Sequence, residues 1–142
     1  MSEYTLHSEL HNIGAKVVHT TRLHRFVSDT PTDHHGTDTG PSPVEYLLGA
    51  LGACLGASAA AYAHSPKYKI KLNKFDMDFT AETERYPDKS SRVTKIHAKI
   101  DCQSDDMDKA KTEQFVEDVI HVSTIHNTLQ NAVEFTFEIT TP

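Results

Sequence analysis

Residues 43–64 form the only long apolar segment in a polar chain of 142 residues. Ser42 suits the N-cap of a helix, because its hydroxyl can accept a hydrogen bond from a free backbone N–H, and Glu45 completes a capping box. Pro43 fits the first helical position, where its missing N–H costs nothing. Pro66 cannot donate to a continuing helix. The sequence therefore predicts one long helix that ends near residue 64.

This helix has two different faces. Apolar and small polar side chains recur at helical spacing on one of them: Leu47, Leu48, Leu51, Cys54, Leu55 and Ser58. The other carries small residues: Gly49, Gly52, Ala53, Gly56 and Ala60. Each glycine costs about 1 kcal/mol of helix propensity relative to alanine, so another element should lie close to this face. A membrane span is the alternative, but Glu45 in the first turn and the lack of flanking Lys or Arg clusters favour a buried central helix.

The composition limits the class of partner and the compartment. The net charge is −6 and no basic run occurs, which argues against nucleic acid or an anionic membrane as a partner. The first residues lack the pattern of a signal peptide, so we expect a soluble cytoplasmic protein. Its two cysteines are then expected to be thiols. The hydrophobic share of 37% is low, and burial in an oligomer interface would compensate for it.

The order of elements predicts a single α+β domain over residues 1–142. Alternating apolar residues indicate strands, and stripes at helical spacing indicate helices. The expected elements are a meander of two or three antiparallel strands (4–29), a loop (30–41), the central helix, a hairpin of two strands (70–81 and 93–102), a helix (107–122), a short helix capped by Ser123 or Thr124, and a strand (133–140). A slip in the alternation between Leu72 and Phe75 predicts a β-bulge there.

The two cysteines differ in their surroundings. Cys54 lies in the middle of the helix, about three turns from its start and too far for the helix dipole to favour a thiolate. A reactive Cys54 would therefore need a cation or a hydrogen-bond donor from another part of the fold, and free cysteine is usually a small buried apolar residue. Cys102 ends a predicted strand beside Asp101, whose charge raises the pKa of a thiol, so we expect a structural role.

The ten histidines suggest no metal site. Their densest group lies in the loop: Asp33, His34, His35 and Asp38. Adjacent histidines in a loop do not set up tetrahedral geometry, and neither CxxC nor HExxH occurs. Ser123 between His121 and His126 could suggest a hydrolase, but the sequence shows no nucleophile elbow. We expect neither a metal nor a cofactor.

Several motifs together resemble the OsmC/Ohr family of thiol peroxidases. They are Asp29-Thr30-Pro31 followed by Gly36, then the proline-opened helix with the pair Leu47-Leu48 and Ala50-Leu51 ahead of Cys54, and the later segment 127–133. The resemblance covers nearly the whole chain. It implies an OsmC-like α+β fold, in which antiparallel sheets pack around a long buried central helix in an intertwined homodimer, with each active site at the subunit interface.

The resemblance also implies a chemistry. Family members reduce organic hydroperoxides or hydrogen peroxide in oxidative-stress defence, through a thiolate that becomes a sulfenic acid and a second cysteine that resolves it as a disulfide. By position, Cys54 matches the peroxidatic cysteine. The implied partners are a second copy of the chain, a small hydroperoxide, and an external thiol or protein reductant.

The chain departs from the family pattern at the second cysteine. That position falls on Ser123, which cannot form a disulfide, and Thr124 replaces the proline that follows. His126 takes a position where the family usually has serine. We expect Ser123, His126 and Leu51 to line the pocket around the thiol.

A further departure concerns the groups that activate the thiol. Val44 takes the place of the acid that follows the helix-opening proline, and Glu45 lies one position later, about 100° around the helix. The activating arginine of the family comes from the early strands, where this chain has Arg22 and Arg25, with Lys16 as a further candidate. Two functions follow from this pattern. One is a peroxidase that uses Cys54 alone, and the alternative is a non-catalytic protein that binds a small apolar ligand at the dimer interface.

Overall fold

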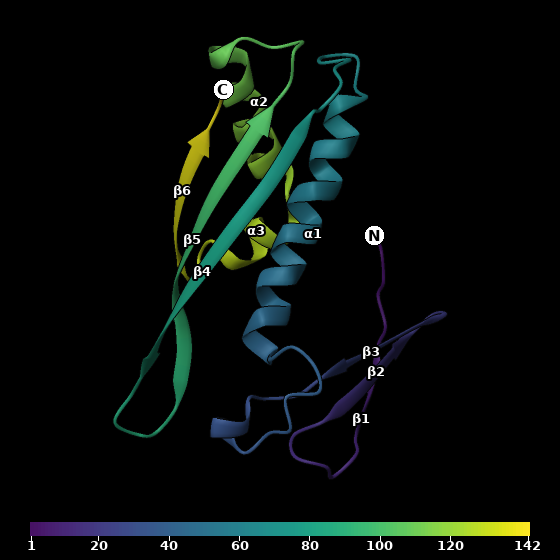
Figure 1. Cartoon of the computed structure of the whole chain (residues 1–142), viewed down its shortest axis with the longest axis vertical. Coiled ribbons are helices and arrows are strands. Elements are labelled where there is room, and N and C mark those ends of the chain that lie inside the picture. Colours follow the sequence, from purple (N-terminus) through teal and green to yellow (C-terminus); the bar gives the residue numbers. More distant parts are fainter. The chain divides into compact units, whose positions relative to one another are not determined.

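The computed structural model describes residues 1–142 and shows a mixed α+β chain with two small sheets (Figure 1). The predicted fold class is confirmed. By its internal contacts the chain divides into two compact units, residues 1–47 and residues 48–142. The central helix α1 (Pro43–Ala63) begins in the first unit and continues into the second.

The first unit holds a meander of three antiparallel strands, as the sequence predicts. The strands are β1 (His7–Leu10), β2 (Val17–Thr21) and β3 (His24–Ser28), in that order across the sheet. The turn between β1 and β2 takes left-handed backbone at Asn12 and Gly14, and the two-residue turn between β2 and β3 does so at Arg22. A short 3-10 helix, η1 (Thr32–His34), interrupts the predicted loop that follows.

One buried carboxylate organises this loop. Asp29 is 1% exposed and accepts hydrogen bonds from the hydroxyls of Thr37 (2.5 Å) and Thr39 (2.6 Å) and from the backbone N–H of Thr30 (2.8 Å). These hydroxyl donors hold the pKa of the Asp29 carboxyl far below its ordinary value. Asp29 therefore stays ionised at any ordinary pH, and the loop is folded around its charge.

Helix α1 starts with the predicted capping box. The N–H of Ser42 donates to Glu45 Oε1 (2.8 Å), and the N–H of Glu45 faces Ser42 Oγ (3.4 Å). The Tyr46 hydroxyl donates to the carbonyl oxygen of Val27 (2.5 Å), so the first turn of the helix is tied to β3. The carboxylate of Glu45 is thus engaged within its own helix start.

The second unit holds a three-stranded sheet and two further helices. Its elements are β4 (Lys74–Arg85), β5 (Ser91–Gln103), α2 (Lys109–Val122), α3 (Thr124–Leu129) and β6 (Glu134–Thr140). Strands β4 and β5 form the predicted antiparallel hairpin. The expectation of antiparallel sheets is wrong for β6, which pairs with β5 in parallel. Helices α2 and α3 lie between these two strands in the chain and supply the crossover that a parallel pair needs.

The start of β4 and the position of its bulge also differ from the prediction. Residues 70–72 lie outside the strand, because the chain first closes a turn in which the N–H of Ile70 donates to the carbonyl of Ala63 (2.9 Å). Both Tyr68 and Ile70 are buried there. The slip in the apolar alternation marks the end of this turn, and the bulge itself lies between Glu82 and Thr83.

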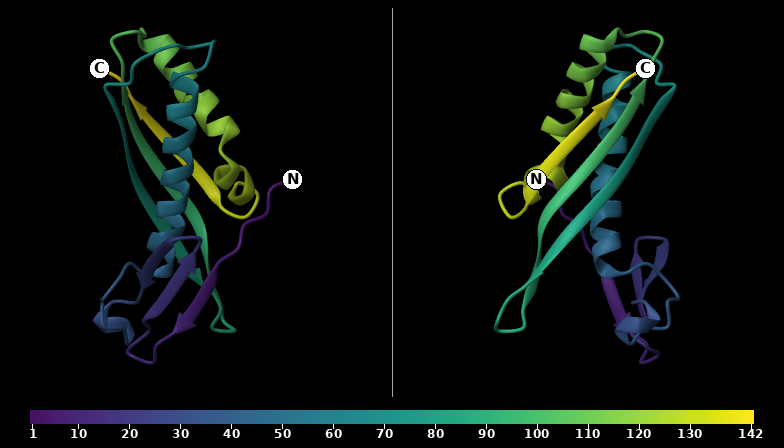
Figure 2. Two further views of the ribbon diagram at one scale, coloured as in Figure 1. Left: turned by 90° about the vertical axis from the view of Figure 1, so that its right-hand side faces the viewer. Right: turned by 60° about the vertical axis from the view of Figure 1, so that its left-hand side comes forward.

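Helices α1 and α2 cover one face of the sheet β4–β6 (Figure 2). The core between them contains Leu51, Leu55, Ala59, Ile96, Ile100, Phe115, Val116 and Val119. The added Cβ of an alanine at Gly52 would lie 3.1 Å from the ring of Phe79, so this glycine permits a close approach of helix and sheet. Gly49 has no such neighbour.

The opposite face of α1 is not covered by the other elements of the second unit. Its small residues Ala50, Ala53, Ala57 and Ala60 are exposed, so this unit alone does not provide the expected burial on most sides. By length and composition alone α1 would also suit a membrane span. That property is weak support for a span, because core helices share it.

We predict that Asp29→Asn loosens the loop of the first unit. The variant keeps the shape of the side chain but removes the charge that accepts from the hydroxyls of Thr37 and Thr39 and from the backbone N–H groups of Ala15, Thr30, Thr37 and Thr39. Hydrogen exchange at the amides of Thr30, Thr37 and Thr39 should accelerate at least about tenfold, while the amides of β5 exchange as before. Asp33→Asn, an exposed change in the same loop, is the control. Unchanged exchange in Asp29→Asn would show that the carboxylate does not hold the loop.

Candidate functional site

The half-buried thiol of Cys54 is the centre of the candidate site. Cys54 flanks the buried stripe of α1 formed by Leu51 and Leu55. Ser58 follows Cys54 by one helical turn on the same face. The remaining neighbours of the sulfur come from the start of α3, at Ser123, Thr124 and Ile125. All of these residues from position 51 onward belong to the second unit.

The start of α3 presents free donors to this sulfur. Ser123 is the N-cap of α3, as predicted, and its Oγ accepts from the N–H of His126 (3.3 Å). The N–H groups of Thr124 and Ile125 belong to the first turn, where no helical carbonyl precedes them. These two amides and the side-chain hydroxyls of Ser123 and Ser58 are the groups that lower the pKa of the Cys54 thiol.

These contacts decide the ionisation of the thiol. Burial raises the pKa of Cys54, but the hydrogen bonds from the amide of Ile125, the hydroxyl of Ser123 and the other two donors outweigh it. The pKa of Cys54 is therefore below its ordinary value. The donors that favour the thiolate within this unit are neutral groups rather than a cation.

Sequence reasoning missed three of the four donors to the thiol. Ser58 could have been found, since a hydroxyl four positions after a helical cysteine lies on its face. The free amides of Thr124 and Ile125 could also have been predicted, because a cap at residue 123 implies free N–H groups in the first turn that follows it. Nothing in the local pattern, however, brings α3 to the middle of α1.

Cys102 has the opposite environment. Its side chain is fully buried in the core of the second unit, and both cysteines are free thiols. Burial, together with the charge of Asp101, raises the pKa of Cys102 to about 11. At neutral pH this thiol is protonated and shielded, in agreement with the predicted structural role.

The predicted pocket residues occupy three different settings. Ser123 is fully buried and contacts the Cys54 sulfur through its hydroxyl. The ring of His126 packs edge-on against Phe135 and Phe137, with centroid distances of 4.8 and 5.5 Å, and so anchors α3 to β6. Leu51 is fully buried in the core. A pocket formed by these residues stays a prediction.

The predicted activating groups lie in the first unit. Glu45 is engaged in the capping box, Arg22 is exposed in the turn between β2 and β3, and Arg25 is exposed on β3. Lys16 precedes β2 and is half-exposed. Their approach to Cys54 stays a prediction. Nowhere in residues 1–142 do three His, Cys, Asp or Glu side chains gather closely enough to hold a metal ion.

Comparison with known proteins agrees with this architecture. The family model for OsmC-like proteins matches residues 36–138. The chain superposes on an OsmC-like protein from Mycoplasma pneumoniae with a TM-score of 0.86 and 23% identity, over 99% of this chain and 97% of the other. It also superposes on the organic hydroperoxide resistance protein OsmC of Legionella pneumophila with a TM-score of 0.73 and 14% identity, over 99% of this chain and 98% of the other. The superposition on the organic hydroperoxide resistance protein OhrB of Bacillus subtilis has a TM-score of 0.68 and 12% identity, over 98% of each chain. None of the curated protein sequences matches the chain.

We predict that Ser123→Ala and Ser58→Ala each make Cys54 less acidic. Each change removes one donor to the sulfur, so the thiolate fraction at pH 7 falls. Iodoacetamide should then alkylate Cys54 about threefold more slowly or worse, as followed by mass spectrometry. Cys102 stays unlabelled at this pH because it is protonated and buried. Thr128→Ala is the matched control, since the Thr128 hydroxyl donates to the carbonyl of Thr124 and not to the sulfur. Equal alkylation rates in all variants would show that the hydroxyls of Ser123 and Ser58 do not lower the pKa of Cys54.

Proposed function

Because the chain belongs to the family of OsmC-like proteins, we propose that it is a thiol-dependent peroxidase that reduces organic hydroperoxides or hydrogen peroxide with Cys54. The observation that carries this proposal is the set of four donors around one half-buried sulfur. A lowered pKa and access to solvent are the two properties that a peroxidatic cysteine needs. The names of two structural relatives as organic hydroperoxide resistance proteins support the same chemistry.

The proposed first step is nucleophilic displacement at the peroxide. The Cys54 thiolate attacks one oxygen of the O–O bond, an S–O bond forms, and the other oxygen leaves as alkoxide or hydroxide and takes a proton from solvent. The products are a sulfenic acid on Cys54 and an alcohol or water. The amides of Thr124 and Ile125 hold the sulfur in place and stabilise its charge before the attack.

The proposed second step uses an external reductant. Ser123 occupies the place of a resolving cysteine and cannot form a disulfide, while Cys102 is sealed in the core. A small thiol or a protein thiol therefore attacks the sulfenic sulfur, which releases water and leaves a mixed disulfide. A second thiol then displaces Cys54 in its reduced form.

We further propose that residues 1–142 form one OsmC-like domain that works as a cytoplasmic homodimer. Apolar surface is left open in both units: Ala50, Ala53, Ala57 and Ala60 on α1, and the side chains of Tyr4, Leu6, Leu10 and Leu23. A second copy would bury this surface. The intertwined arrangement would also give Arg22 or Arg25 a route to a Cys54 thiolate.

Peroxide consumption tests the proposal directly. The purified protein should consume about one equivalent of cumene hydroperoxide or hydrogen peroxide without reductant, and dimedone should then label Cys54. Cys54→Ser should lose this reaction by at least about a hundredfold, whereas Cys102→Ser, the matched control, should keep it. Equal slow reaction of the wild type and Cys54→Ser would reject the peroxidase and favour the alternative, a non-catalytic holder of a small apolar ligand.

Ser123→Cys tests the geometry of the missing resolving position. The Ser123 hydroxyl is one of the groups that lower the pKa of the Cys54 thiol, so we expect a thiol at this position to come within disulfide range. After one equivalent of peroxide the variant should form an internal disulfide with Cys54, seen as a mass loss of about 2 Da. Ser58→Cys is the comparison, since a disulfide between residues four apart on one continuous helix is strained. A stable sulfenic acid in Ser123→Cys would contradict the proposed arrangement.

A further inference from the structure

The imidazole of His126 is a polar ring buried among aromatic side chains. His126 is 9% exposed, and its ring centroid lies 4.8 Å from that of Phe135 and 5.5 Å from that of Phe137. The two phenyl rings stack on each other, 8° from parallel. They are two positions apart on β6 and so point to the same face of the sheet, where both pack against the core of the second unit. His126 therefore rests on a paired aromatic surface.

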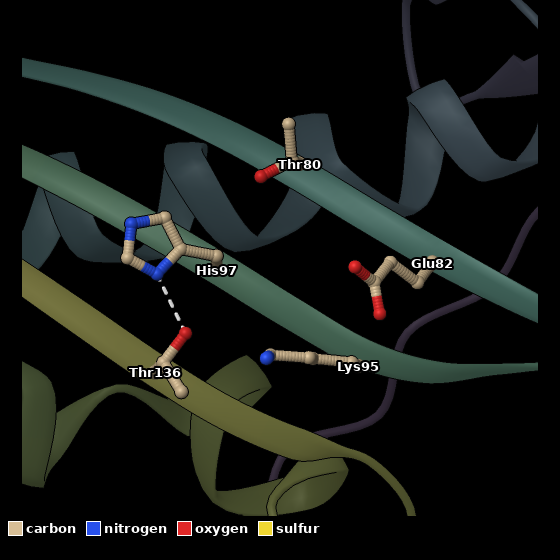
Figure 3. A pocket seen from close by; sticks show the side chains of 5 residues that line it. All are labelled: Thr80, Glu82, Lys95, His97 and Thr136. Carbon is tan, nitrogen blue, oxygen red and sulfur yellow. Dashed lines mark hydrogen bonds between the residues drawn. The ribbon is translucent and has the colours of Figure 1, made fainter.

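The strand that carries this aromatic pair is itself fixed. Thr136 lies between the two phenylalanines in the chain, so its side chain points to the opposite face of the sheet. The Thr136 hydroxyl and His97 Nδ1 share a hydrogen bond of 2.6 Å, drawn in Figure 3. The two residues are partners in the parallel register of β5 and β6. The aromatic pair thus has a defined position relative to the rest of the sheet.

The backbone of α3 connects the His126 ring to the surroundings of the thiol. The N–H of His126 donates to Ser123 Oγ (3.3 Å), and Ser123 is fully buried. Ser123, Thr124 and Ile125 directly precede His126. They supply three of the groups that lower the pKa of the Cys54 thiol, and His126 supplies none. Because a helix of six residues is not stable by itself, the position of α3 depends on its side-chain contacts.

The ring of His126 contributes more to these contacts than its nitrogen atoms do. His126 Nδ1 and Asn127 Oδ1 share a hydrogen bond of 3.3 Å, and Asn127 Nδ2 donates to the carbonyl of His121 (2.9 Å). Asn127 is exposed, so water competes for these hydrogen bonds and their net contribution is small. The contact with the aromatic pair is buried and carries the larger part of the attachment of α3 to β6.

We propose that His126 is a positioning residue for the Cys54 thiol: the contact of its ring with Phe135 and Phe137 fixes the first turn of α3, and with it the groups that face the sulfur. This inference deepens the proposed function and rests on it for its catalytic meaning. Hydrogen bonds weaken steeply as their angle closes, so a small rotation of α3 is enough to reduce the stabilisation of a thiolate. His126→Ala removes the ring and permits that rotation, whereas His126→Phe keeps an aromatic ring on the same surface.

The pH profile of Cys54 alkylation tests this role. In His126→Ala the profile should move to higher pH, and iodoacetamide should alkylate Cys54 at pH 7 at least about threefold more slowly than in the wild type. His126→Phe should keep the wild-type profile. His121→Ala is the matched control, since the side chain of His121 is exposed at the end of α2. An unchanged profile in His126→Ala would overturn the proposal, and so would a His126→Phe profile equal to that of His126→Ala.

A second pair of variants changes the same contact from the side of β6. Phe135→Leu removes a partner ring and should move the profile in the same direction. Phe75→Leu is the same kind of change on β4 and should leave the profile unchanged, because Phe75 contacts Phe115 rather than His126. Labelling of Cys102, which is buried in the folded protein, reports any variant that has lost its core. If His126→Ala is such a variant, the two phenylalanine changes decide, and equal profiles for them would overturn the proposal.

The outcome is separable from that of the peroxidase test, because alkylation needs no peroxide. A shifted profile in His126→Ala without peroxide consumption by the wild type would reject the proposed function and leave the positioning of the thiol standing. Peroxide consumption by the wild type with an unchanged profile in His126→Ala would do the reverse. When both proposals hold, His126→Ala should also consume cumene hydroperoxide at pH 7 at least about threefold more slowly than the wild type.

Discussion

The packing of one stripe of α1 on the sheet β4–β6 sets the position of everything else in the thiol site. Leu51 and Leu55 are fully buried against this sheet, which fixes the rotation of the helix. Cys54 lies at the flank of that stripe, so its sulfur reaches the boundary between core and surface. The same rotation turns Ala50, Ala53, Ala57 and Ala60 outward, whereas Ala59 and Ala63 are buried in the core. Small residues on an exposed helix face would let a second helix or sheet approach closely.

The thiol is activated by hydrogen bonds rather than by a charge within its own unit. The cap at Ser123 fixes the backbone of the first turn of α3, so the amides of Thr124 and Ile125 are already oriented toward the sulfur. Their effect depends on contact geometry and is screened little by salt, unlike that of an exposed cation. An arginine from another element would add to this stabilisation. The pKa of the Cys54 thiol is thus lowered by groups of its own unit alone.

Much of the fold could be predicted from the sequence, because its signals are local. A few residues are enough to mark a helix or strand boundary, as in the capping box at Ser42 and Glu45, the turn residues at 12–14 and the cap at Ser123. The direction of β6 could not be read in this way, since Val133 to Thr140 alternate equally well in a parallel or an antiparallel pair. The bulge wrongly predicted near Leu72 has a similar origin, because Tyr68 and Ile70 are buried by a turn that closes on Ala63.

The candidate site could likewise be predicted only in part. Cys54 was evident from the chain, but the donors from α3 meet it only through tertiary packing.

The parallel strand β6 is linked to the surroundings of the thiol through α3. The last strand carries Phe135 and Phe137, which clamp the ring of His126. That ring holds α3, and α3 supplies the amides that face Cys54. Loosening β6 would therefore release the amides of Thr124 and Ile125 and return the pKa of the Cys54 thiol toward its ordinary value.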